Sequence, residues 1–520
     1  ICPPTLCPYY LRPGSTAPVQ VYLRQVRGYF SSPQATSNDS YLSSYVNDSW
    51  AVNRRVTINA GLRWEEEQLN GPNQQYVFND NWSPRLGINI DPFADRKTKV
   101  FFNWGRYTQG LPTDAAIREL NQELDIFSVR WAAPSDGTNL LTNADGTVTP
   151  VLDAAHLLNK TNGFGSISAS SAVVPELIHS GTRLNFEEEY LLGFEREVAS
   201  GMVLDVRYSD RRLERIVEDM QGVSPEGANA GLANQIYLIG NPSPSSDYFT
   251  NEIEEKYDPA VGPPANCVDD YGAQQDSLGN TVGAACGQNP DVAGLPTPDG
   301  KADGFATPVR RYQSLEVELN KNFSRGFLIR ANYRFAKLWG NYEGLFRNDN
   351  GQSDPGISSL FDFTQGVIGL LGAQFTPGYL NTDRRNVGNL YGSYTVSNGM
   401  FRKLTGGVGL RGQTGTPISS LASHPVYQNV GEIPIGGRGT AGTTATNLQL
   451  DTHLDYPFSF GDKGSLKLAF DGFNVTNSQF IRTVNQNIDT GFQQAADPSF
   501  RSPTSFQRAF YGRFSVRYEF

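Results

Sequence analysis

The sequence contains no long hydrophobic run, and this absence excludes a transmembrane helix. Nowhere among the 520 residues do about 18 apolar residues follow one another, whereas a helix needs about 20 to cross a bilayer. The mean hydropathy of −0.42 is typical of a soluble protein. It is equally typical of a membrane β-barrel, because strands that alternate apolar and polar residues average to a low hydropathy.

Catalytic and metal-binding signatures are also missing. The four histidines (His156, His179, His424 and His453) are scattered, and no GxSxG, HExxH or phosphate-binding loop occurs. In TPDGKADG (297–304), Asp299 and Asp303 resemble part of a calcium loop, but Lys301 stands where an oxygen ligand is needed. Turn chemistry explains such Asp-Gly pairs. The sequence therefore predicts no enzyme, no cofactor and no metal site.

Cysteine is scarce, and the four that occur form two local pairs. These are Cys2 with Cys7, and Cys267 with Cys286 in a segment rich in Gly, Pro and Asp. Two loop disulfides in an oxidising compartment are the favoured interpretation, and four free thiols are the alternative. Zinc is disfavoured, because neither pair has CxxC spacing and histidine is rare.

Positive charge is in deficit. With 43 Lys and Arg against 53 Asp and Glu, the net charge is −10, which argues against nucleic-acid binding. One hypothesis is that the acidic excess bridges to lipopolysaccharide through divalent cations. The first residues, ICPPTLCPYY, have neither a basic segment nor an apolar segment of a signal peptide, so we expect a mature product or a fragment.

What the sequence has in abundance is alternation with period two. In VTINAGLRWE (56–65) every even position is apolar, and every odd position except Gly61 is polar. In NLQLDTHLDYPFSF (447–460) the polar face contains Asp451, His453 and Asp455. Such alternation predicts strands with one apolar and one polar face. If the polar face lines a lumen, these three residues are candidates for contact with a plug, a substrate or water.

Strand length and loop length distinguish a membrane barrel from a soluble sandwich or propeller. Many predicted strands have about 10 to 15 residues, against about 5 to 6 in globular proteins, and a membrane-crossing strand needs about 9 to 11. Short connections alternate with long ones, and aromatic residues gather at strand ends. The sequence predicts an all-β, antiparallel transmembrane β-barrel with short periplasmic turns and long extracellular loops at about 110–183, 214–308, 342–383, 417–446 and 478–506.

The chain ends on an alternating strand, RFSVRYEF (513–520). Its outward residues would be Phe514, Val516, Tyr518 and Phe520, and a terminal Phe resembles the signal by which the barrel-assembly machinery recognises outer-membrane barrels. The full set of predicted strands is approximately 19–30, 41–52, 56–67, 83–91, 99–109, 184–198, 202–213, 309–321, 326–341, 384–396, 403–416, 446–460, 465–477 and 507–520.

Several phrases resemble the barrel of TonB-dependent receptors, most closely the Oar-like branch. They are SYVNDSWAVNRRVTINAGLRWE (44–65), NWSPRLGINIDPF (81–93), KVFFNWGRYTQG (99–110), DRRNVGNLYGSY (383–394) and LAFDGFNVTNSQF (468–480). The resemblance implies a barrel of 22 strands with an N-terminal plug. Since about 14 strands are visible, residues 1–520 are expected to be the C-terminal part of the barrel, with the plug and first strands absent.

By this resemblance the protein would move a bulky substrate through a plugged barrel, with energy from the TonB complex. The loops 110–183 and 214–308 would capture the ligand. The expected partners are outer-membrane lipid, lipopolysaccharide, the TonB complex and the barrel-assembly machinery. Two alternatives stay open: a passive 14-stranded channel, and an adhesive or structural outer-membrane protein. The substrate and the direction of transport are not predicted.

Overall fold

The computed structural model describes most of the chain. The described residues are 36–71, 75–113, 177–221, 237–248, 300, 302, 305–347, 361, 375–423, 430–490 and 495–520, with the backbone of short strands between 7 and 282. Within them no helix is both long enough and apolar enough to span a membrane.

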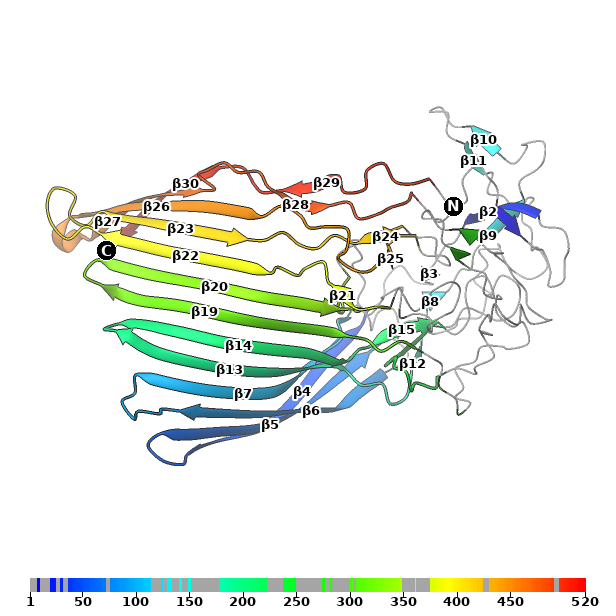
Figure 1. The fold of residues 1–520 in the computed structure, drawn as a ribbon, viewed down its shortest axis with the longest axis horizontal. Coiled ribbons are helices and arrows are strands. Elements are labelled where there is room, and N and C mark those ends of the chain that lie inside the picture. The colour runs from blue at the N-terminus through cyan, green and yellow to red at the C-terminus, as the bar shows by residue number, and fades with distance from the viewer. Residues whose placement is uncertain are drawn as a thin grey trace.

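One large antiparallel sheet dominates the molecule (Figure 1). Its thirteen consecutive strands follow the chain order, so that each strand pairs with its neighbours in sequence. The strands are β4 (Asn38–Ala51), β5 (Val56–Asn70), β6 (Gln75–Ile90), β7 (Thr98–Gln109), β13 (Asn185–Ala199), β14 (Met202–Arg215), β19 (Arg310–Ser324), β20 (Phe327–Gly340), β22 (Asn386–Thr395), β23 (Thr405–Gln413), β26 (Asn447–Ser459), β27 (Ser465–Phe473) and β30 (Tyr511–Glu519). The two-residue strand β21 (Gly378–Tyr379) adds to the end of β20.

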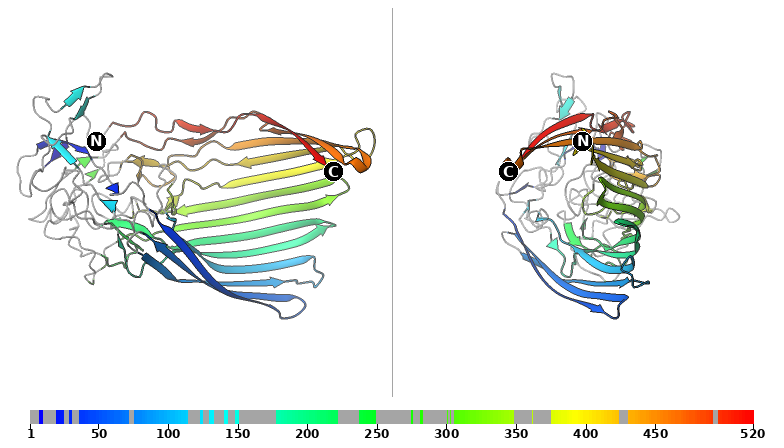
Figure 2. Two further views of the ribbon diagram at one scale, coloured as in Figure 1. Left: turned by 180° about the vertical axis from the view of Figure 1, so that it is seen from behind. Right: turned by 90° about the vertical axis from the view of Figure 1, so that its left-hand side faces the viewer.

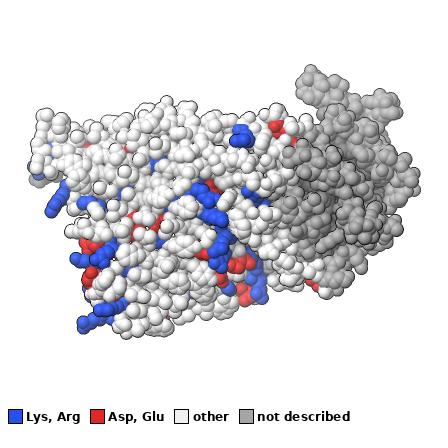
Figure 3. Space-filling model, viewed as in Figure 1, with Lys and Arg blue, Asp and Glu red and all other residues white. Residues whose placement is uncertain are grey.

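The sheet curves through an arc whose two rims are β4 and β30 (Figure 2). Cross-strand register assigns each side chain to the convex or the concave face, because directly paired residues lie on the same face. Leu192, for example, is paired with Phe102 and with Tyr208, and all three belong to the convex, apolar face. Figure 3 shows this face, on which charged side chains gather in separate patches on an otherwise uncharged surface.

The predicted all-β fold is confirmed, and so are thirteen of the fourteen predicted strands. The strand expected at 19–30 is wrong as a member of the large sheet. Its residues form the six-residue β2 (Val19–Arg24), which pairs with β1 (Cys7–Tyr9) and β9 (Val129–Ala132), and the separate β3 (Tyr29–Phe30). Six residues are fewer than the roughly 9 to 11 that a tilted strand needs to cross a bilayer, so alternation alone was misleading there.

Tight connections join the strands at one end of the sheet. The β13–β14 and β19–β20 hairpins turn at Gly201 (φ 66°) and Gly326 (φ 84°), in the left-handed region that glycine adopts without strain. The β26–β27 turn contains a short 3-10 helix, Gly461–Lys463. The hydroxyl of Tyr518 donates to the carbonyl of Lys463, so the end of β30 lies against this turn.

The buried apolar residues gather at the opposite end, where the long connections lie. One cluster contains Ile216, Tyr342, Phe361, Phe375 and Ile433; two others are built around Leu69 and Met220. Small strands accompany them: β8 (Glu123–Leu124), β10 (Leu140–Thr142), β11 (Val148–Pro150), β12 (Leu177–Ile178), β15 (Glu218–Gln221), β16 (Tyr237–Gly240), β17 (Gln274–Gln275), β18 (Thr281–Val282), β24 (Ser420–Ala422), β25 (Ile433–Ile435), β28 (Ile481–Val484) and β29 (Pro503–Phe506). The hydrophobic core therefore lies among the connections, while the curved wall keeps its apolar side outward.

Gly193 gives a test of the packing on the concave face. The ring of Phe101, paired across the strands, covers it so closely that a Cβ at Gly193 would lie 2.1 Å from Phe101 Cζ. Gly193→Ala should destabilise the protein by about 1–3 kcal/mol in urea unfolding, because the buried ring must move. Gly406→Ala is the matched control, since a Cβ there meets nothing within 4 Å. Equal stability of both variants would contradict the packing described.

Candidate functional site

The concave face of the sheet is lined with charged side chains, and most of these are joined in ion pairs. Most of the pairs connect neighbouring strands, whereas the pair of Arg63 with Glu65 lies within β5. They include Lys99 with Glu195, Arg207 with Glu316 and Glu318, Arg211 with Glu189, and Arg63 with Glu65. A polar wall with paired charges suits the inner surface of an aqueous passage.

The three lumen candidates from the sequence lie on this concave face of β26. His453 is the centre of their contacts: its Nδ1 lies 2.6 Å from Asp471 Oδ1 and its Nε2 lies 2.8 Å from Asp455 Oδ2. Asp451 accepts hydrogen bonds from the Gln449 side chain and from the backbone N–H of Asn474.

Two cations complete the His453 cluster. Lys467 Nζ lies 3.1 Å from Asp455 Oδ1, and Arg513 Nη2 lies 2.9 Å from Asp471 Oδ2. An imidazole that faces a carboxylate at each nitrogen can donate to both only when it carries two protons. The cluster thus ties β26, β27 and β30 together on the concave face. With each carboxylate already paired, it offers no general base and no open ligand set.

A hollow of about 310 Å³ lies farther along the same wall, over β4, β5 and β6. Its polar lining comes from Asn47, Arg63, Ser83 and Arg85. The Arg85 guanidinium stacks 4.8 Å from the ring of Tyr107. Within the described residues no group of three or more His, Cys, Asp or Glu is arranged to hold a metal ion.

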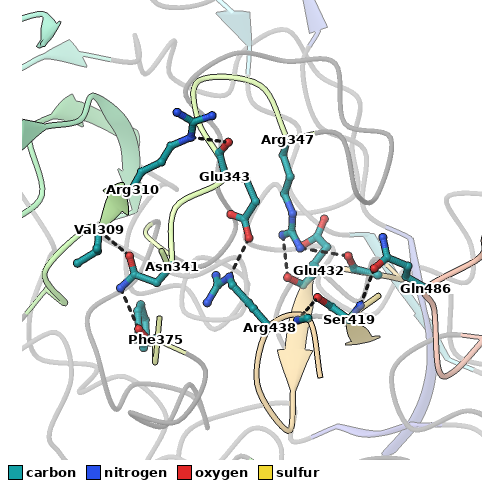
Figure 4. Close-up of polar contacts among 12 residues, drawn as sticks. Val309, Arg310, Asn341, Glu343, Arg347, Phe375, Ser419, Glu432, Arg438 and Gln486 are labelled. Atoms are coloured by element: carbon teal, nitrogen blue, oxygen red, sulfur yellow. Dashed lines mark hydrogen bonds and ion pairs between the residues drawn. The ribbon is translucent and has the colours of Figure 1, made fainter. Parts of the chain in front are cut away.

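A second polar cluster lies among the long connections, beyond the ends of the strands (Figure 4). Asn341, directly after β20, accepts a hydrogen bond from the N–H of Val309 and donates to the carbonyls of Thr307 and Phe375. Ser419 accepts from the N–H of Gly439. These side chains form hydrogen bonds with backbone groups that have no partner in a sheet or helix. They thereby hold the connections in place.

The centre of this cluster is a buried ion pair. Arg438 Nε lies 2.9 Å from Glu343 Oε1, and the two side chains are only 4% and 5% exposed. Arg347, also buried, donates to the carbonyl of Glu432. Burial by itself would raise the pKa of the Glu343 carboxyl, but Arg438 and Arg347 outweigh it and hold that pKa below the ordinary value of 4.5. Connections far apart in the sequence are thereby joined in one layer.

Sequence reasoning did not find this second cluster. The one signal that points to it is the density of apolar residues inside the predicted loops, such as Tyr342, Leu345 and Phe375, which a solvated loop does not need. These three residues belong to the buried apolar clusters among the same connections.

The other candidates are distributed differently. Phe514, Val516 and Tyr518 lie on the convex face of β30, paired with Phe470, Leu468 and Leu466, and Phe520 follows the strand fully exposed. The side chains of Cys2, Cys7, Cys267 and Cys286 lie outside the described residues, and so do Asp299, Lys301 and Asp303 and most of 110–183 and of 214–308.

Comparison with known proteins agrees with this architecture. The family model for the outer membrane beta barrel domain matches residues 69–493. The TonB-dependent transporter Oar of Myxococcus xanthus is 26% identical over 94% of this chain. That match covers 43% of the Oar protein, so the chain spans less than half the length of this relative.

Solved structures show a partial likeness to this chain. The pyoverdine outer membrane receptor FpvA of Pseudomonas aeruginosa has a TM-score of 0.44 and 13% identity, covering 95% of this chain and 44% of the receptor. The outer membrane transporter YddB of Escherichia coli has a TM-score of 0.44 and 11% identity, covering 92% of this chain and 53% of the transporter.

Proposed function

The chain belongs to the outer membrane β-barrel domain family and resides in the outer membrane, and from this premise we propose that it is the C-terminal barrel portion of a TonB-dependent transporter. The resemblance to the Oar-like branch found in the sequence is confirmed by the match to the Myxococcus xanthus transporter. That match supports the proposal most directly, because it extends over 94% of this chain.

The two polar clusters suggest separate roles for the long connections and for the concave wall. The packed layer around Glu343 and Arg438 would form a rigid extracellular opening, here called the mouth. This layer would position the outer loops for ligand capture. The paired charges of the concave wall, including those around His453, would face a plug supplied by a preceding segment and would give a polar substrate a hydrated path. No covalent chemistry is proposed for any residue.

The proposed partners follow from the same placement. TonB would act on the plug, and the barrel-assembly machinery would recognise β30 with Phe514, Val516, Tyr518 and Phe520. Lipid would contact the apolar convex face, and a phosphorylated glycolipid would lie at the outer rim of that face.

A conductance measurement separates the proposed transporter from a passive channel. We expect full-length protein from outer membranes to give little steady conductance in a planar bilayer, because a plug fills the lumen, and to bind the periplasmic domain of TonB. Binding is to be measured with the same preparation, after its intact mass has been compared with 57.1 kDa. Large, persistent conductance without TonB binding would refute the transporter and favour the passive channel.

A further inference from the structure

A row of charged side chains crosses the convex face near the end that carries the long connections. Arg106 on β7 is paired with Glu188 on β13, Glu188 with Arg212 on β14, and Arg212 with Arg311 on β19. Four consecutive strands thus place three arginines and one glutamate at the same level. We call these four residues the arginine row. Figure 3 shows a patch of basic residues on this face, with acidic residues among them.

On the side of the short turns, the convex face becomes apolar two levels from the row. The adjacent level carries Trp104, Tyr190, Asp210, Gln313 and Lys337. The levels beyond it carry Phe102, Leu192, Tyr208, Leu315 and Phe335, and then Val100, Phe194, Val206, Val317 and Tyr333. Arg196 and Lys321 reintroduce charge on this face four and five levels from the row.

The spacing fits the thickness of a membrane. At about 3.3 Å per residue, the ten residues from Arg311 to Lys321 cover roughly 33 Å along β19. A strand tilt of about 40° reduces this to roughly 25 Å along the membrane normal, the height of the apolar band of such barrels. Since long loops mark the extracellular side, the arginine row lies at the head-group level of the outer leaflet.

Two carboxylates hold the arginines of the row: Glu188, within the row, lies 2.9 Å from Arg106 Nη2, and Asp210 lies one level away. Asp210 is 7% exposed and binds both neighbours: Arg212 Nη2 at 3.0 Å and Arg311 Nε at 2.9 Å, with Arg311 Nη2 also donating. The two arginines are 44% and 39% exposed. Their Nη1 groups have no partner among the described residues, so one buried carboxylate orients two guanidinium groups whose other edges remain available.

Aromatic rings hold the remaining cations at the same level. The guanidinium groups of Arg106 and Arg215 lie 4.3 and 4.9 Å from the ring of Phe186. Lys337 lies 5.5 Å from the ring of Trp339, and Trp339 is paired with Arg311. Cations interleaved with aromatic rings are typical of a membrane interface, where the ring contacts acyl chains and the cation contacts head groups.

We propose that the arginine row, with Lys337, is a binding site for the phosphate groups of an outer-leaflet glycolipid of the lipid A class. Arg106, Arg212, Arg311 and Lys337 bring four positive charges against the two of Glu188 and Asp210, and the guanidinium fork matches a phosphate in shape. The site faces lipid, so its ligand arrives with acyl chains beside Phe335 and Leu315. This direct contact differs from a bridge of divalent cations between acidic residues, and it rests on the outer-membrane placement alone, not on transport.

Native mass spectrometry of the full-length protein in detergent tests the proposal. The probes are bisphosphorylated lipid A and the same lipid after removal of both phosphates. The variant is Arg212→Gln/Arg311→Gln, and the control is Arg196→Gln, on the same face of β13 but at the opposite end. We expect the double variant to bind bisphosphorylated lipid A roughly tenfold or more weakly, since each basic residue near a charged surface contributes substantially to binding. The control should bind as the unchanged protein does.

Two results would overturn the proposal: equal binding of lipid A by the double variant, or equal binding of the lipid with and without phosphates by the unchanged protein. Folding is checked by heat-modifiable migration on a gel. If the double variant does not fold, Lys337→Gln takes its place, because the described contacts of Lys337 are with the rings of Trp339 and Tyr379. Its binding must then fall several-fold for the proposal to stand.

Discussion

Arg438→Met should open the layer at the extracellular mouth, because it leaves the Glu343 carboxylate buried without its partner. Breaking a buried ion pair from one side costs about 3–5 kcal/mol, far more than the pair contributes when intact. We expect amide hydrogen exchange in 341–347 and 431–439 of the full-length protein to accelerate by about 10²- to 10⁴-fold, the equivalent of that free energy. The strands of the wall should keep their protection, since their hydrogen bonds do not depend on the pair.

Two matched variants test whether the faster exchange of Arg438→Met is caused by the loss of the charge partner of Glu343. Glu343→Gln/Arg438→Met removes both charges and should recover most of the protection. Arg183→Met removes one partner of the exposed Arg183–Asp80 pair and should cost no more than about 1 kcal/mol. If Arg438→Met exchanges no faster than Arg183→Met, the buried pair does not hold the layer together.

The Glu343–Arg438 ion pair also predicts how low pH affects the stability of the packed layer at the mouth. The pKa of Glu343 is held below its ordinary value of 4.5, so its contribution to stability is present above that value. It is lost as the pH falls through the lower, folded-state pKa, because the carboxyl must then be protonated. The protection of 341–347 against hydrogen exchange, taken relative to the intrinsic exchange rate at each pH, should therefore fall at low pH, and the Glu343→Gln/Arg438→Met variant should lack this component.

Leu192→Arg should strongly destabilise the wall, because Leu192 lies near the middle of the lipid-facing surface. It is 55% exposed on the convex face, between Phe102 and Tyr208. An arginine at the midplane of a barrel's lipid face costs about 2–4 kcal/mol. The measurement is the free energy of unfolding in urea of the protein inserted in lipid vesicles.

Leu191→Arg is the control for this prediction, since the same substitution one residue earlier faces the concave wall. Its neighbours across the strands are Asn103 and Ser209, and the hydrated surface there should accept a charge with a change within about 1 kcal/mol. Equal destabilisation by the two variants would contradict the assignment of the faces.

The sequence by itself determined the strands and their two faces. A period of two is a local property, and each face has a different solvent, so the alternation around Leu192 or His453 already tells which side chains share a surface. For the same reason the convex position of Phe514, Val516 and Tyr518 could be predicted before any pairing was known. The error at 19–30 shows the limit, because alternation says nothing about which sheet a strand joins.

Only the tertiary structure decided which residues meet across strands and between loops. The arginine row needs the register of four strands, and register depends on where each hairpin turns, as at Gly201 and Gly326. Glu343 and Arg438 are separated by 95 residues. Their pairing follows from the packing of Tyr342 and Ile433 in one apolar cluster, a long-range contact that no local pattern encodes.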